Sequence, residues 1–550
     1  MIVHLPLLFF FLKFSLSIFL LFSNEFFHSS AWSFTAQAEA KTFSVPKDEI
    51  FLVDNRHKIS KNSQPKELSK EVESTAKADS IQNANEIQSD EQLLELYHQK
   101  IERLTAKCLE LGMPLEAEIT KKCWLESQPG EFVIQIVPSS PAPKQLPDDA
   151  SSLQKYWFKT YCKLRRDYAI HFFQRAEQAA SENRGFDAIQ LAYLALNIDP
   201  DYEPVRSVFG YSLYNEQWRT HWEIRQLEKG FIDHQHFGWI SNDLVERYNQ
   251  GERFYRGKWV SIQKETELRR QNKDPWRIET EHYQLRTTLS LEEGVRICRL
   301  LEDYYEVWQR FFYRFAATNK EWATRFLNKK INATQRHYII LYQNRDEYLK
   351  ELISFDQNIH KSSGGYFPEV KCIFVYEPSD PDDSALDEML IHEATHQLFH
   401  EKRSASTKTN NLKSIYPGQK ANFWVIEGIS VYMESFRKKG DLYIIGGKDN
   451  YRFQRAKERC SEPNGYLPLS QYASLSMKSF QNNDNVPMLY TQAAGLTSFF
   501  LHYDNEKYHN AFIDYLFLVY NEQDDLQTLE RLTQKTFEEL DLEYNNYMKP

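Results

Sequence analysis

The pattern of apolar and polar positions changes several times along this 550-residue chain. Residues 1–22, MIVHLPLLFFFLKFSLSIFLLF, are almost continuously apolar, and Ala-x-Ala sites follow at 36–38 and 38–40. This order is typical of a secretory signal peptide, which we predict over residues 1–40. An uncleaved membrane anchor is the alternative, because the apolar stretch is long and its positively charged part is poor.

Polar residues dominate the next part of the chain. Residues 41–90 contain few aromatic side chains and cannot bury enough apolar surface to offset chain entropy, so a disordered spacer is predicted there. A helical segment is predicted over 91–127. A proline-rich linker is predicted over 128–152, where the prolines are Pro129, Pro138, Pro141, Pro143 and Pro147.

Residues 153–262 are predicted to form a mainly helical region. Small residues and a proline follow the spacing of a repeat of about 34 residues, at Ala169, Ala176, Ala188, Ala195 and Pro200. This segment resembles a tetratricopeptide repeat, a module that binds protein partners. A plain helical hairpin is the alternative, because a stable array needs about three repeats. Farther on, NEQWRTHWE and YRGKWVSIQKE resemble each other and predict two short hairpins.

From Pro275 onward the pattern mixes strands and helices. WRIETEHYQLRTT (276–288) predicts a strand, and Ser290 with Glu293 predicts a capping box at the start of a helix. HYIILYQ (337–343) and KCIFVYE (371–377) predict two further strands, with a Gly-Gly turn in SGGYFPE before the second. The remainder is mainly helical. We therefore predict an α+β chain of two or more domains, the last over residues 275–550.

Charge and cysteine content exclude some classes of function. The net charge of −10 argues against nucleic acid or an anionic membrane surface as the main partner. Membrane contact is expected only if the leader is uncleaved. The chain has 6 cysteines and none forms a C-x-x-C pair, so a zinc ribbon is unsupported.

The stretch LIHEATHQLFH contains a candidate metal site. His392 and His396 lie four residues apart, so on a helix both imidazoles face one side and can reach one ion. Apolar neighbours predict that this helix is buried, and two buried histidines are costly unless something pairs with them. Two hydrogen-bonded histidines beside a solvated Glu393 are the alternative.

A carboxylate farther along the chain strengthens the metal interpretation. In NFWVIEGISVYMES, Glu427 lies 31 residues after His396 (427 − 396), inside an apolar stripe where an unpaired carboxylate would be expensive. Two histidines and a glutamate leave a fourth position open for water, which is the pattern of catalytic zinc. The sequence therefore predicts Zn²⁺ bound by His392, His396 and Glu427.

HEATHQLFHE followed by FWVIEGISVYMES resembles the gluzincin metallopeptidases of the peptidase MA clan, most closely a bacterial peptidase-MA-like family of unknown function. The resemblance implies a thermolysin-like catalytic domain, with a small sheet and a helical half, and Glu393 as the general base. It also implies that Tyr490, 63 residues after Glu427 (490 − 427), hydrogen-bonds the oxyanion. Gln492 and Ala493 replace the Lys-Gly that usually follows this tyrosine, and the aminopeptidase motif Gly-x-Met-Glu-Asn has no counterpart.

Two function classes follow from these patterns. The first is a secreted or periplasmic zinc-dependent peptidase that hydrolyses a peptide or protein substrate through water activated by zinc. The second is a non-catalytic or highly restricted peptidase-fold scaffold, whose tetratricopeptide-like region binds a protein partner. His400 is predicted to be a surface or supporting residue, and Glu388 and Glu434 are predicted either to orient a ligand or to be ordinary helix residues.

Overall fold

The computed structural model describes residues 89–122, 127–136, 142–271, 273–328, 336–354, 359–361, 364–378, 383–402 and 416–549. The predicted leader, and the predicted spacer up to residue 88, lie outside these residues. The described chain divides into two compact units, with the boundary at Arg103–Leu104 inside helix α2 (Asp90–Glu110). No helix of the described residues has both the length and the apolar character to span a membrane.

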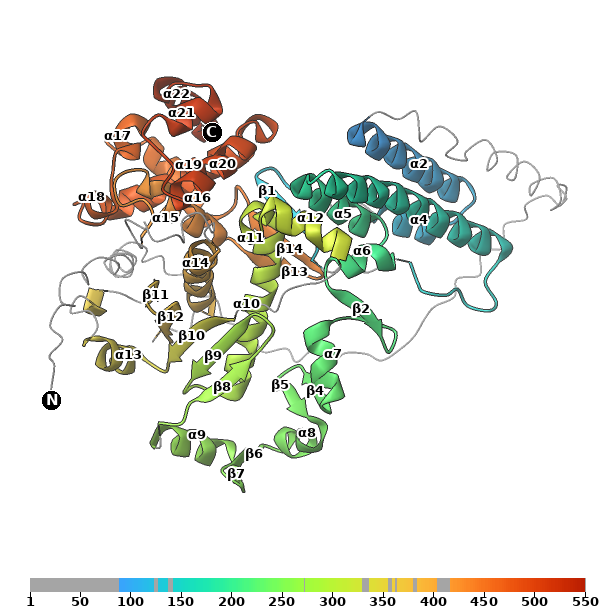
Figure 1. The fold of residues 1–550 in the computed structure, drawn as a ribbon, viewed down its shortest axis with the longest axis horizontal. Helices are drawn as coiled ribbons and strands as arrows, with labels where there is room; N and C mark the ends of the chain where they lie inside the picture. Colours follow the sequence, from blue (N-terminus) through green and yellow to red (C-terminus); the bar gives the residue numbers. More distant parts are fainter. Residues whose placement is uncertain are drawn as a thin grey trace, which may run out of the picture. The chain divides into compact units, whose positions relative to one another are not determined.

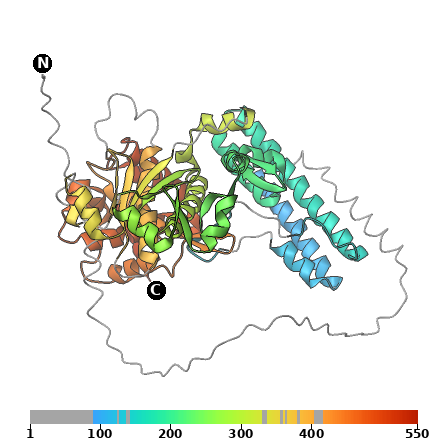
Figure 2. The ribbon, with the colours of Figure 1, turned by 90° about the horizontal axis from the view of Figure 1, so that it is seen from below.

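Helices dominate the beginning of the unit that contains Leu104 and the residues after it (Figure 1). They are α3 (Pro114–Lys121), α4 (Ser152–Ser181), α5 (Gly185–Ile198) and α6 (Glu203–Val208). Small side chains let α4 and α5 pack closely, since Ala169, Ala176, Ala188 and Ala195 are all fully buried. Helix α12 (Asn319–Asn328), which comes much later in the chain, lies beside both of them (Figures 1 and 2).

In residues 211–271, three hairpins alternate with three helices. The segments are β2 (Tyr211–Tyr214), β3 (Gln217–Thr220) and α7 (His221–Glu228); β4 (Phe231–His234), β5 (Gly238–Ser241) and α8 (Asn242–Asn249); and β6 (Glu252–Tyr255), β7 (Lys258–Ser261) and α9 (Ile262–Gln271). Two of these hairpins were predicted. The middle one was missed, although Trp218, Trp239 and Trp259 recur at equivalent places. The two strands of the middle hairpin, β4 and β5, have only 4 residues each and leave little periodicity to detect.

A mixed five-stranded sheet, in the order β11-β12-β10-β9-β8, forms the β part of the following region. Its strands are β8 (Trp276–Glu279), β9 (Tyr283–Thr287), β10 (His337–Tyr342), β11 (Gly364–Phe367) and β12 (Cys372–Tyr376). Strand β10 is parallel to both β9 and β12, whereas β8 and β11 are antiparallel edge strands. The helices and connections here are α10 (Leu291–Phe311), α11 (Tyr313–Ala316), α13 (Arg345–Leu352), η2 (Ile359–Lys361) and α14 (Asp383–Glu401).

Three local predictions in this region need correction. The strand predicted over 276–288 is a hairpin, because Thr280 turns the chain and its N–H donates to the Tyr283 carbonyl at 3.0 Å. The predicted Gly-Gly turn is strand β11, where a Cβ at Gly364 would lie 2.8 Å from a Val375 methyl group. The capping box is half formed: Ser290 accepts from the Glu293 N–H at 3.0 Å, but the Glu293 carboxylate pairs with Arg296 instead.

The C-terminal part is mainly helical and encloses α15 (Phe423–Met433), all of whose residues are buried. The other helices are α16 (Tyr451–Cys460), α17 (Leu469–Ala473), α18 (Met477–Gln481), α19 (Val486–Glu506), α20 (His509–Tyr520), α21 (Thr528–Thr533) and α22 (Phe537–Met548). A small sheet has the order β1-β14-β13, from β1 (Glu131–Ile134), β13 (Arg437–Lys439) and β14 (Leu442–Gly446). The predicted linker over 128–152 therefore contributes a strand to a sheet far away in sequence.

The close approach of α15 and α19 requires a glycine at position 428. A Cβ atom there would lie 2.5 Å from the Thr497 hydroxyl and 3.0 Å from the Ala493 carbonyl oxygen. Helix propensity alone favours alanine by about 1 kcal/mol, whereas overpacking costs about 1–3 kcal/mol. We expect Gly428→Ala to lower the free energy of unfolding by about 1 kcal/mol, and by no more than about 2 kcal/mol, measured by urea titration.

A suitable control for that variant is Gly365→Ala. The nearest atom to a Cβ at Gly365 is a ring carbon of Phe367 at 3.4 Å, an ordinary contact distance. A Gly428→Ala protein as stable as the wild type would contradict the crowding argument.

Candidate metal centre

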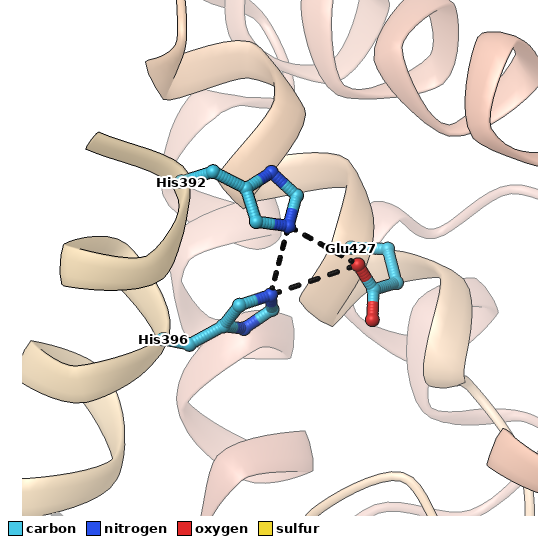
Figure 3. Close-up of side chains that lie close together, drawn as sticks. All are labelled: His392, His396 and Glu427. Atoms are coloured by element: carbon cyan, nitrogen blue, oxygen red, sulfur yellow. Dashed lines mark hydrogen bonds and ion pairs between the residues drawn. The ribbon is translucent and has the colours of Figure 1, made fainter. Parts of the chain in front are cut away.

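Two buried helices bring the predicted ligands together (Figure 3). His392 and His396 project from one side of α14, as their four-residue spacing predicts, and Glu427 projects from α15. Their burial is extensive, since His392 and Glu427 are each 5% exposed. Helices α14 and α15 pack directly against each other, so the packing of the core sets the distances within the site.

The three ligand atoms form a compact triangle. The Nε2 atoms of His392 and His396 are 3.1 Å apart, and each lies 3.6 Å from Oε2 of Glu427. Tetrahedral zinc with bonds of about 2.0–2.1 Å separates its ligand atoms by about 3.3 Å, so the triangle has the right size. Within the described residues, this is the one group of three His, Cys, Asp or Glu side chains whose ligand atoms all lie within 4.8 Å. The residues therefore fit zinc.

Hydrogen bonds on the far side of each imidazole orient the ligand atoms. Nδ1 of His392 lies 2.9 Å from the Glu434 carboxylate, and Nδ1 of His396 lies 3.3 Å from the Ser430 hydroxyl. That hydroxyl donates to the Ile426 carbonyl at 3.1 Å, so its oxygen is free to accept from His396. When both Nδ1 atoms carry the proton, both Nε2 atoms present lone pairs to the site, the tautomer that metal ligation requires.

Without a metal, the charges around the site favour a proton on His392. Burial opposes a charged imidazole, but hydrogen bonds with Glu427 and Glu434 raise the pKa of His392 to about 10. Burial likewise opposes the Glu427 anion, but the charges of His396 and His392 and their hydrogen bonds lower the pKa of Glu427 to about 2. The carboxylates of the centre therefore stabilise a positive charge between the imidazoles and Glu427.

Glu393 lies beside the ligands and lines the same pocket. Its Oε2 atom accepts a hydrogen bond of 2.7 Å from the backbone N–H of Tyr366, on the edge strand β11. A fixed carboxylate at the pocket wall is the arrangement expected of a general base. Sequence reasoning missed Tyr366, because its segment was interpreted as a turn.

Tyr490 lines this pocket as well, from helix α19. Tyr490 is 2% exposed, and its hydroxyl lies near the Glu427 carboxylate. Burial first, and then the nearby Glu427 charge, raise the pKa of this phenol well above its usual value. The hydroxyl therefore keeps its proton at neutral pH and can donate it. Gln492, two residues after Tyr490, accepts from the Leu467 N–H at 2.9 Å and donates to the Leu467 carbonyl at 2.7 Å.

The structure distinguishes between His400 and Glu434, for which the sequence left alternatives open. His400 lines the pocket but lies outside the ligand triangle, and its Nδ1 is 3.1 Å from the Tyr366 hydroxyl. Glu434 holds His392, as described above. Arg452, which no sequence signal indicated, holds Glu434 in turn through contacts of 2.8 and 2.7 Å. Although burial opposes ionisation, Arg452 and His392 keep the pKa of Glu434 below its ordinary value.

The Glu434 carboxylate is expected to strengthen metal binding from behind His392. Replacing such a partner of a ligating histidine typically lowers metal affinity by about 10–100-fold. We expect Glu434→Gln to weaken zinc binding by this factor, measured by competition with a chelator. The matched control is Glu458→Gln, which removes an exposed carboxylate paired with Arg455. Equal affinity in both variants would show that Glu434 has no such role.

Comparison with known proteins adds no relative to this picture. No protein-family model matches the chain, and a search of curated proteins finds no match. The interpretation of the centre therefore rests on the geometry of its own residues.

Proposed function

We propose that this protein is a zinc-dependent peptidase of the gluzincin type, secreted or periplasmic if its leader acts as a signal peptide. The observation that carries the proposal is the triangle of His392, His396 and Glu427, with the two Nδ1 atoms already engaged elsewhere. A structural site would use a fourth protein ligand, whereas three ligands beside an open pocket are typical of catalysis.

The proposed chemistry assigns a task to each side chain of the pocket. When bound, zinc supplies a Lewis acid that makes water more acidic and polarises the scissile carbonyl. Glu393 takes a proton from the attacking water and passes it to the departing amine. The Tyr490 hydroxyl donates a hydrogen bond to the carbonyl oxygen as negative charge develops on it. The Tyr366 N–H keeps the Glu393 carboxylate in place for both transfers.

The fold is compatible with the finer architecture that we propose. A mixed sheet with an edge strand beside α14, followed by a helical half, supports a thermolysin-like catalytic domain. The buried alanines of α4 and α5 support a tetratricopeptide-like packing, which we propose as a surface for a protein partner.

Metal analysis together with peptide digestion tests the function. Purified protein should contain one equivalent of zinc and cleave members of a peptide library, and a chelator should abolish cleavage until zinc is restored. One equivalent of zinc without any cleavage would favour the scaffold function instead. Protein that binds no zinc under any condition would overturn both the metal centre and the peptidase.

A further inference from the structure

A second cavity, of about 550 Å³, lies on the other side of helix α10 from the metal centre. One side of α10 faces α14, where the Tyr304 hydroxyl lies 2.5 Å from the Thr395 hydroxyl and Trp308 packs on Phe399. Glu302 and Glu306 line the cavity from the opposite side of the same helix. Helix α10 therefore stands between the cavity and α14, the helix that carries His392 and His396.

The far wall of the cavity comes from the hairpin segments described above. Trp218 and Trp222 belong to the first hairpin-helix segment, and Trp239 belongs to the second; all three line the cavity. The rings of Trp222 and Trp239 meet edge to face, with centroids 5.4 Å apart. The cavity thus offers indole surfaces opposite the acidic side of α10.

Carboxylates outnumber cations in this lining. Its lysine and arginine side chains are already used, since Arg299 pairs with Asp233 at 2.5 Å and Lys438 pairs with Asp303 at 2.9 Å. His282 is likewise paired with Glu302, at 2.6 Å.

Three further carboxylates of the lining have no ion pair within the described part of the chain: Glu281, Glu306 and the exposed Asp441. Glu281 accepts a bond of 2.7 Å from the Thr220 hydroxyl, and Glu306 has no hydrogen bond or ion pair within the described part of the chain. Burial raises the pKa of Glu306 to about 7 and also raises the pKa of Glu281. Ionising these buried carboxylates is costly, and a cation bound in the cavity would offset that cost.

The residues of the lining favour an organic cation over a metal ion. Among the described residues, the carboxylates of this cavity form no group of three close enough to hold a metal ion. Indole faces attract ammonium and guanidinium groups, and they do so most strongly where water is excluded. The volume is in the range of about 300–1,000 Å³ found for small-molecule and side-chain pockets.

We propose that this cavity binds an organic cation, an ammonium or guanidinium group such as the end of a lysine or arginine side chain, between the indoles and the carboxylates of Glu281 and Glu306. The proposal goes beyond the peptidase function and does not depend on it, because the cavity shares no lining residue with the metal centre.

Calorimetric titration of the full chain tests this site. The probes are acetyl-Gly-Arg-Gly-amide, its citrulline analogue as a neutral control of equal shape, spermidine, and calcium chloride. We expect saturable binding of the arginine peptide and none of the citrulline peptide. The Glu281→Gln/Glu306→Gln double variant should bind the arginine peptide at least about tenfold more weakly, because charge-assisted contacts are lost. Tighter binding of spermidine would identify a free amine as the source of the cation.

The matched control replaces Glu228 and Glu246 by Gln, exposed residues on α7 and α8 outside the cavity. Unchanged zinc content and an unchanged or higher melting temperature would show that the cavity variant is folded. Equal binding of the citrulline peptide, undiminished binding in the cavity variant, preferential binding of calcium, or no saturable binding of any organic cation would each overturn the proposal.

Discussion

The Glu393→Gln variant is expected to lose peptide hydrolysis while keeping its zinc. Glutamine has nearly the same shape and can still accept from the Tyr366 N–H, but it cannot take a proton from water. General acid–base catalysis contributes about 10²–10⁴-fold, so kcat should fall by that factor. Turnover of the best library peptide, measured beside zinc content by elemental analysis, tests this expectation.

The control for this variant is Asp387→Asn, on the same helix but outside the lining of the pocket, where its carboxylate pairs with Arg296 at 2.9 Å. It should retain full activity. A Glu393→Gln protein that hydrolyses peptides at the wild-type rate would end the proposed role of this residue. Loss of both zinc and activity would instead show that the substitution disturbs the centre itself.

The Glu427→Gln variant is expected to lose zinc almost completely. It removes the anionic ligand, whereas Glu434→Gln only weakens a partner of a ligand, so the loss of affinity should exceed about 100-fold. Dialysis of both proteins against the same buffered zinc concentration, followed by elemental analysis, measures the difference. Stoichiometric zinc in the variant would exclude Glu427 from the ligand set.

The same substitution should destabilise the metal-free protein in a pH-dependent way. The pKa of Glu427 is lowered to about 2, so its contribution is present above its ordinary value near 4.5 and is lost as pH falls toward 2. The pKa of His392 is raised to about 10, so its contribution is full below 6.5 and is lost as pH rises toward 10. Contacts between Glu427 and His392 contribute to both shifts, and removing one partner of such a buried pair costs about 3–5 kcal/mol.

The melting temperatures of the metal-free wild type and Glu427→Gln should therefore differ most between about pH 5 and 6 and converge toward pH 10.

The affinity of the wild type for zinc should instead increase with pH. Zinc displaces the His392 proton, so the affinity should rise about tenfold per pH unit until pH approaches 10. An affinity independent of pH between 7 and 9 would contradict the protonated state of His392 in the metal-free site.

Local periodicity explains which parts of the centre could be predicted. His392, Glu393 and His396 lie on one helix, where spacing alone sets their relative positions. Glu427 was conspicuous because a carboxylate inside an apolar helix needs a partner. Glu434 was predicted either to orient a ligand or to be an ordinary helix residue, and its contact with His392 could not be assigned. Arg452 gave no signal, since its role arises only from the packing of α16 near the end of α15.

The sequence by itself determined the α+β class, the pair of imidazoles on one helix face and the candidate carboxylate, because each depends on contacts within a helix or on the cost of an isolated buried charge. Only the tertiary structure decided what surrounds them. Gly364 and Gly365 are typical of a turn, yet they belong to the edge strand that carries Tyr366. A Cβ at Gly364 would lie 2.8 Å from a Val375 methyl group and 3.1 Å from the Met389 sulfur. The glycine is there because distant segments meet at that point, and such a contact leaves no period in the sequence.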